Sequence, residues 1–409
     1  MGCVSIDEIK QGMVLSDDVL DINQKLLLTK GQTITSKHIR IFKIWGIAEV
    51  NVFGKKEKKS GIEPRINPEL VEKIEDQTKQ TFKNIDLEHP VAKEVFKLSD
   101  SYRCNNVGPN TYKSVNLIKS DNLANNLKPN IGEKIKSVEI KLPELSSIVA
   151  ELNEIVADPL ASANDVAEVV NKSPSLTALL LKIANSAFYG FPSKIDTISR
   201  AVTLIGSKQI ASLALGVSIM NSFKDIPKAI VDMESFLKHS LACGLISRIL
   251  SAHMNIGQTE QMFVSGLLHD IGRLVLYKYF PDESKEFFKL AVESDKSLLA
   301  VECSHIGFSH ARIGKNLLNA WKLPVTLENN VVFHHRPSEA LDQKKATIIH
   351  LADIIVNGLG LGTSGERLIS LMDYKALENI DVPVTIFNTV SQLAIHQLAS
   401  FESFFNDQK

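Results

Sequence analysis

The most constraining feature of this chain is the helical periodicity of its apolar residues from about residue 134 onwards. Segments such as PELSSIVAELNEIVAD and QIASLALGVSIMNSF repeat apolar residues at i, i+3, i+4 and i+7, which places an apolar stripe along a helix. Prolines at positions 143, 159, 174, 192 and 227 interrupt the pattern, so it predicts several short helices. We expect residues 134–370 to form a mainly α, multi-helix bundle, followed by a helical extension over residues 371–409.

The first 54 residues have a different pattern of apolar residues from the rest of the chain. VLSDDVLD, KLLLTKGQTI and AEVNVF carry strand-like apolar runs, and SKHIRIFKIWG has apolar residues at helical spacing. Ser36 is a suitable N-cap for that helix, and Gly46 a suitable stop. Residues 1–54 are therefore expected to form a small α/β module ahead of the bundle.

Residues 55–133 are expected to link the module to the bundle. The lysines of residues 55–66 could suggest a nucleic-acid or membrane patch, but no aromatic residues interleave and acidic groups follow, so we expect a solvated linker. Residues 67–100 are typical of one polar-faced helix or a pair. Residues 101–133 are rich in Asn, Lys, Ser and Gly, which predicts a second flexible segment.

Composition narrows the class of protein further. The chain has 409 residues, more than one hydrophobic core usually supports, and a formal net charge of −1, which gives no signature of DNA or an anionic membrane as partner. Apolar runs fall short of the roughly 20 residues of a membrane span. The four cysteines are scattered without a C-x-x-C spacing, so we expect a reducing, cytoplasmic location and interpret Cys243 and Cys303 as small buried apolar residues.

Histidine and aspartate side chains stand on several apolar segments of the bundle. They are His239, His269, Asp270, His310, His334, His335 and Asp353. Such groups are costly to bury unless they are paired or bind a metal, and a bundle can aim residues from separate helices at one point. Histidine with aspartate suits a divalent transition metal such as iron, manganese or zinc. For any one histidine, a hydrogen-bonded core position is the alternative.

The order of these residues resembles that of the HD superfamily of metal phosphohydrolases, and of HD-GYP domains in particular. The shared order is His, then His-Asp followed by Ile-Gly, then His, then His-His, then Asp. Carried over residue by residue, the resemblance implies that all seven residues are metal ligands. Where the family has a lysine after His-Asp-Ile-Gly, this chain has Arg273, which would offer a phosphate contact of different geometry.

Two further features resemble the HDOD branch of this superfamily. The Glu-Arg-x-Asp-Gly-x-Gly-Tyr-Pro loop of HD-GYP domains is absent after His335, where the chain reads Arg336-Pro337-Ser338. Residues 141–206 are similar to the HDOD N-terminal lobe, including the Asn-Ser-Ala-Phe-Tyr-Gly block at 185–190. Residues 1–54 resemble the small module that often precedes HD-GYP domains, at positions 12–13, 26–31 and 50–52.

The resemblance implies two alternative functions. The first is a bacterial signal-transduction protein with a non-catalytic, regulatory HDOD output domain that retains a metal site. The second is a metal-dependent phosphohydrolase or phosphodiesterase acting on a nucleotide second messenger, with Arg273 assisting. The lost HD-GYP loop argues against hydrolysis of cyclic di-GMP. A signalling protein or a small nucleotide is the expected partner, and a homodimer is compatible with both functions.

Overall fold

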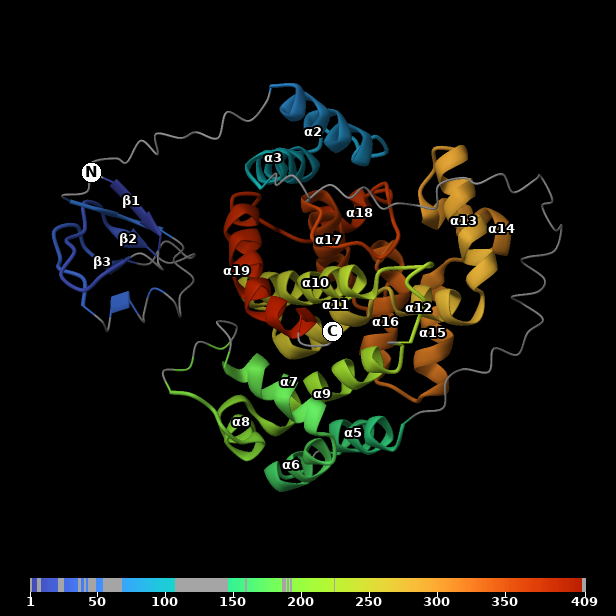
Figure 1. Ribbon diagram of the computed structural model, residues 1–409, viewed down its shortest axis with the longest axis horizontal. Coiled ribbons are helices and arrows are strands. Elements are labelled where there is room, and N and C mark those ends of the chain that lie inside the picture. The colour runs from blue at the N-terminus through green and yellow to red at the C-terminus, as the bar shows by residue number, and fades with distance from the viewer. Residues whose placement is uncertain are drawn as a thin grey trace.

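Two hydrophobic cores organise the protein in the computed structural model, a small one near the N-terminus and a large helical one (Figure 1). The structure describes residues 2–5, 9–20, 26–35, 38–39, 42, 49–53, 68–106, 146–158, 160–185, 189, 191, 193–223 and 225–406. The predicted linker 55–66 and most of the predicted flexible segment 101–133 lie outside these residues. The fold is mainly α, as predicted.

The N-terminal module contains two pairs of short antiparallel strands. Strand β1 (Gly2–Ser5) pairs with β4 (Glu49–Val52), and β2 (Val19–Leu20) pairs with β3 (Leu26–Leu28). The apolar side chains of Leu15, Ile34 and Phe42 are fully buried between them. Strand β1 was not predicted from the sequence. Of the predicted helix, His38, Ile39 and Phe42 are described and helical, whereas Ser36 and Gly46 lie outside the described residues.

All the named elements after the module are helices. The first half comprises α2 (Pro68–Thr81), α3 (Pro90–Asn105), α5 (Ser147–Ala157), α6 (Ala163–Asn171), α7 (Pro174–Asn185), α8 (Ile198–Ile205), α9 (Ser207–Asn221), α10 (Met233–His253) and α11 (Thr259–Leu268). The second half comprises α12 (Ile271–Tyr279), α13 (Pro281–Glu293), α14 (Leu298–Ile306), α15 (His310–Ala320), α16 (Val325–Phe333), the 3₁₀ turn Pro337–Glu339, α17 (Gln343–Leu359), α18 (Tyr374–Glu378) and α19 (Ile386–Asn406).

Helix α3 and the residue after α2 belong to the large core, although the sequence predicted a linker with a helical segment here. Phe82 and Val95 are buried in that core, and α3 lies against α17. The Arg103 guanidinium donates from Nε to the carbonyl oxygen of Gly358 at 2.7 Å and from Nη2 to that of Asn357 at 2.9 Å. Helix α3 runs to Asn105, so residues 101–105 are helical where the sequence predicted the start of a flexible segment.

Helices α10 and α17 form the centre of the bundle. Both are buried on nearly every face, as expected of helices with neighbours all round. Asp232 caps the N-terminus of α10, and Asp342 caps that of α17. Helix α19 packs against α10, so the predicted C-terminal extension also contributes to the large core through residues such as Phe387 and Val390.

Helices α5 to α9 form the lobe that precedes α10 (Figure 1). Helix α6 begins with a capping box between Ser162 and Asp165, and α8 and α9 meet at Gly206 with a bend of 120°. Among the described residues no single helix combines the length and apolar character of a membrane span; only the bent pair α8 and α9 meets that test together.

A close backbone contact at Gly272 brings α12 against α15. A Cβ atom at this position would collide with the carbonyl oxygen of His310 and lie 2.7 Å from the backbone nitrogen of Gly314. Only glycine permits this approach, since backbone atoms cannot rotate away. The contact places the start of α15 beside the turn that follows Asp270.

We expect Gly272→Ala to destabilise the protein by about 1–3 kcal/mol, the usual cost of overpacking a core, with a value near the upper limit because the obstacle is backbone. Urea unfolding followed by circular dichroism measures this. Asn316→Ala, at an exposed position of α15, is the matched control and should change stability by less than about 0.5 kcal/mol. Equal stability of both variants would contradict the close contact.

Candidate metal centre

The structure brings all seven predicted ligands together at the centre of the bundle. His239 lies on α10 and Asp353 on α17, while His269 and Asp270 occupy the junction between α11 and α12. The other three lie at helix ends. His310 is the first residue of α15, and His334 and His335 follow the end of α16. Their side-chain donor atoms form two adjoining clusters.

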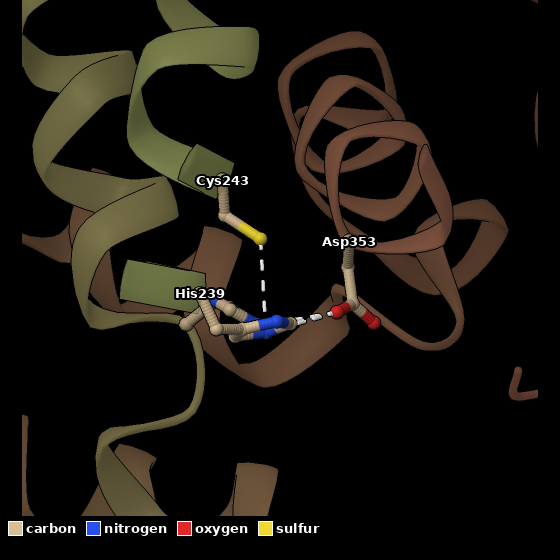
Figure 2. Close-up of side chains that lie close together, drawn as sticks. His239, Cys243 and Asp353 are labelled. Carbon is tan, nitrogen blue, oxygen red and sulfur yellow. Dashed lines mark hydrogen bonds and ion pairs between the residues drawn. The ribbon is translucent and has the colours of Figure 1, made fainter. Parts of the chain in front are cut away.

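The first cluster contains His239, His269, Asp353 and one residue that was not predicted, Cys243. His239 Nε2 lies 3.3 Å from His269 Nε2, 3.4 Å from Asp353 Oδ1 and 3.7 Å from Cys243 Sγ. Figure 2 shows the Cys243 sulfur and the Asp353 carboxylate directed at the ring of His239 from two different helices. These separations exceed the roughly 2.9 Å of a good N–H···O hydrogen bond.

The second cluster contains Asp270, His310, His334 and His335. His310 Nε2 lies 2.9 Å from Asp270 Oδ1, 3.1 Å from His335 Nε2 and 3.5 Å from His334 Nε2. The other oxygen of Asp270 faces the first cluster, 3.3 Å from His269 Nε2. One carboxylate therefore stands between the two clusters and can serve both.

Helix ends fix the orientation of two imidazoles. His269 donates from Nδ1 to the carbonyl oxygen of Gly266, and His334 donates from Nδ1 to that of Val331, both at 2.7 Å. Since a carbonyl can only accept, Nδ1 carries a proton and Nε2 is the ring atom directed at the cluster. Each histidine thus uses the C-terminus of its own helix to aim a ligand atom inward.

Glu302 of α14 positions His310. Its Oε2 accepts from Nδ1 of His310 at 2.6 Å and from the backbone N–H of the same residue at 2.9 Å. The carboxylate therefore caps α15 and orients the imidazole at once, a combination typical of metal-bound histidines. His350 supports His334 in turn, since its Nδ1 donates to the His334 carbonyl oxygen at 2.7 Å.

Electrostatics at the two clusters favour bound cations. Burial opposes ionisation of Asp270, but the charges of His269, Arg273 and His310 outweigh it and hold the pKa well below its ordinary value. Burial lowers the pKa of His269, yet Asp270 and Asp353 raise it to about 10. Burial and the charge of His269 together lower the pKa of His334 to about 3. Positive charge is thus stabilised between the carboxylates, while His334 stays neutral and able to bind a metal.

The residues present fit a metal centre. The donor set of imidazole and carboxylate suits iron, manganese or zinc, and the side chains that would hold an ion are 0–9% exposed, apart from the half-buried His335. Buried carboxylates that lack a cation are strongly destabilising. A metal bound here would neutralise this charge and act as a Lewis acid towards oxygen ligands.

Comparison with known proteins identifies one domain in the chain. The sequence pattern of the HDOD domain matches residues 142–337. The chain carries an HDOD domain. The helices that bear His239 to His335 lie inside the match, whereas α17, which supplies Asp353, lies beyond its end.

Solved structures confirm the HDOD fold. An HDOD domain protein of unknown function from Geobacter sulfurreducens is 21% identical, with a TM-score of 0.52 over 68% of this chain and 95% of its own. A protein from Shewanella amazonensis, provisionally named a phosphohydrolase, is 21% identical with a TM-score of 0.51, over 65% and 97%. A protein from Marinobacter aquaeolei, provisionally named a signal transduction protein, is 20% identical with a TM-score of 0.52, over 65% and 60%.

One curated protein also matches by sequence. An uncharacterized protein of Treponema pallidum is 24% identical over 214 residues, which is 52% of this chain. The match spans 41% of the Treponema protein, so this chain covers less than half of that relative's length.

Arg273 of the HDOD domain is enclosed by carboxylates. Its side chain is 1% exposed, with Nη2 3.2 Å from Glu366 and Nε 3.5 Å from Asp270 and 4.0 Å from Glu302. Glu366 also accepts from the backbone N–H groups of Leu298 and Leu299 at the start of α14. Its role as a phosphate contact stays a prediction; in the structure the guanidinium links the site to α14.

Two contributors were missed from the sequence. Glu302 was given no role at the site, and Cys243 was interpreted as a small apolar residue. The same interpretation of Cys303 as buried was wrong, since Cys303 is exposed. A signal existed for Cys243, because it follows His239 by four residues and hence one helical turn. Burial and then the charges of Asp353 and Asp270 raise the pKa of the Cys243 thiol well above its ordinary value.

We expect Arg273→Met to destabilise the protein by about 3–5 kcal/mol, because it leaves buried carboxylates without their cation. Arg336→Met is the matched control, since Arg336 is 72% exposed in its pair with Glu339, and such pairs contribute less than about 1 kcal/mol. Denaturant unfolding of both variants provides the measurement. A residue that served only to contact phosphate would give a small effect at position 273 as well.

We expect Asp270→Asn and His335→Ala to differ in metal content. The first removes the negative charge that lies between the two clusters, so ion binding should weaken at both. The second removes one ligand of the second cluster, so about one ion should remain, bound by the first. Elemental analysis after gel filtration measures the stoichiometry. Equal losses in the two variants would contradict the division into two clusters.

Proposed function

We propose that this protein is a regulatory signal-transduction protein whose HDOD domain holds a metal centre that stabilises the fold and does not turn over substrate. The observation that carries the proposal is the enclosure of the ligand set: six of the seven predicted ligands have side chains no more than 9% exposed. A phosphoester substrate must reach the metal ions and displace water from them. Ligands with so little exposed surface suit a structural ion better.

The environment of the basic residues supports the same proposal. Hydrolysis of a phosphodiester needs cations that bind the phosphate oxygens. Arg273 is committed to Glu366, Asp270 and Glu302. Arg336, which follows the His-His pair, is mostly exposed and contacts Glu339, so it does not point into the clusters.

Hydrolysis of a nucleotide second messenger is the second candidate function. It is favoured by Asp270, whose two oxygens face different clusters, an arrangement that suits two neighbouring metal ions. Such pairs can clamp both the attacking and the leaving oxygen of a phosphoryl group. The provisional names of some structural neighbours are consistent with either candidate.

The proposed partner is a signalling protein or a small nucleotide, and the proposed location is the cytoplasm. In this scheme the N-terminal module receives the signal and the helical domain presents the response. The metal centre fixes the relative positions of α10, α11, α15, α16 and α17, so a change at any of these helices reaches the others.

We expect protein purified without added metal to contain a transition metal and to hydrolyse cyclic di-GMP far more slowly than about 1 per second, a low rate for an enzyme. The double variant His269→Ala/Asp270→Ala should lose the metal and about 3 kcal/mol of stability, the linkage expected when free metal exceeds its dissociation constant about a hundredfold. Elemental analysis, product chromatography and thermal unfolding are the measurements.

His396→Ala, at an exposed position of α19, is the control and should keep both metal and stability. Turnover at about 1 per second or faster that disappears in the double variant would replace the regulatory function by the hydrolytic one. A wild-type protein without metal would overturn both.

A further inference from the structure

The side chain of Cys243 lies where a fourth ligand of the first cluster would be needed. It follows His239 by one turn of α10, and its sulfur lies 3.7 Å from His239 Nε2. Every pair of donor atoms among Cys243, His239, His269 and Asp353 lies within 4.8 Å. Figure 2 shows the sulfur on the side of the His239 ring that also faces Asp353. Three helix segments therefore direct four donors at one point.

Close backbone packing between α10 and α11 fixes the position of Cys243 relative to His269. A Cβ atom on Gly266 would lie 2.6 Å from the carbonyl oxygen of Cys243, so α10 and α11 touch through their main chains at this level. Gly266 also accepts the hydrogen bond that orients His269. The thiol and the imidazole are thus positioned by the same contact and not by flexible side chains.

Four of the six separations between these donors are known, and they match the edges of a tetrahedron. Nitrogen or oxygen donors about 2.1 Å from an ion at tetrahedral angles lie about 3.4 Å apart, and a sulfur donor at about 2.3 Å lies about 3.6 Å from a nitrogen donor. The observed separations are 3.3, 3.4 and 3.5 Å among the imidazoles and Asp353, and 3.7 Å between sulfur and nitrogen. Octahedral angles at the same bond lengths would give about 3.0 Å.

We infer that Cys243 is a metal ligand and that the first cluster is a closed, tetrahedral site for an ion of the zinc class. Thiolate with two imidazoles and a carboxylate favours zinc over magnesium or manganese, and four protein donors leave no position for a water molecule. Binding forms a metal–sulfur bond and releases the thiol proton to solvent. The second cluster has no sulfur donor, so the two positions differ in their preferred metal.

This inference rests on the proposed metal centre. It also gives a chemical reason why the ion of the first cluster would not take part in catalysis. An ion with four protein ligands cannot activate water, so only the second cluster could supply a nucleophile. The alternative role for Cys243 is a buried thiol that fills space in the core. Only a sulfur bound to the ion would give a sulfur-to-metal charge-transfer absorption band, and this band provides the test.

Cobalt(II) is the probe, introduced into the full-length protein in place of the native metal. We expect intense visible d–d absorption typical of four-coordinate cobalt and a near-ultraviolet sulfur-to-cobalt charge-transfer band. Cys243→Ser should lose the near-ultraviolet band and bind zinc at least about tenfold more weakly, since even residues outside the first coordination shell contribute that much. Cys303→Ser, at an exposed cysteine outside both clusters, should keep the band.

A second measurement needs no substitution. X-ray absorption at the zinc edge of the wild-type protein should show a sulfur atom at about 2.3 Å beside nitrogen and oxygen atoms at about 2.0–2.1 Å. Cobalt bound without a sulfur band, or zinc without a sulfur neighbour, would overturn this inference and leave the proposed function standing. A protein that binds neither metal would overturn the proposed function itself.

Discussion

Burying the carboxylate of Asp270 requires positive charge on both of its sides, because an ionised group inside a protein is tolerated only when it is paired. One oxygen faces His239 and His269 and the other faces His310 and His334. The residue sits at the junction of α11 and α12, so the helices that supply those histidines must converge there. The close contacts at Gly266 and Gly272 make this convergence sterically possible.

The ligands of this buried polar centre are surrounded by further residues that hold them in place. The ligands are held by Glu302, His350 and the helix carbonyls, and Glu302 is linked through Arg273 to Glu366. Each added group satisfies a charge or hydrogen bond left by the previous one. Networks of this type specify one arrangement strongly, since a single missing partner leaves a buried group unsatisfied.

The sequence predicted the helical class, and it singled out the residues that the structure gathers at the centre of the bundle, because both depend on local pattern. Asp353 could be singled out since it is the acidic residue in an otherwise apolar helix, and His269-Asp270 because a helix ends there. Other features depend on contacts between distant residues. Helix α3 continues past residue 101 because Arg103 meets α17, and strand β1 exists because it pairs with β4. The environment of Arg273 is set by Glu366, 93 positions later, which no local pattern reveals.

The contact of Arg103 with α17 has a consequence for folding during synthesis. Arg103 and Gly358 are separated by 255 positions, and Asn357, whose carbonyl Arg103 also binds, donates from its side chain to Asp353 at 2.7 Å. At typical rates of about 5–20 residues per second, the ribosome needs about 10–50 s to cover that interval. Throughout this time α3 lacks its partner and the ligand set lacks Asp353. A contact between residues so far apart leaves the earlier helix exposed to chaperones and proteases until the last third of the chain has been made.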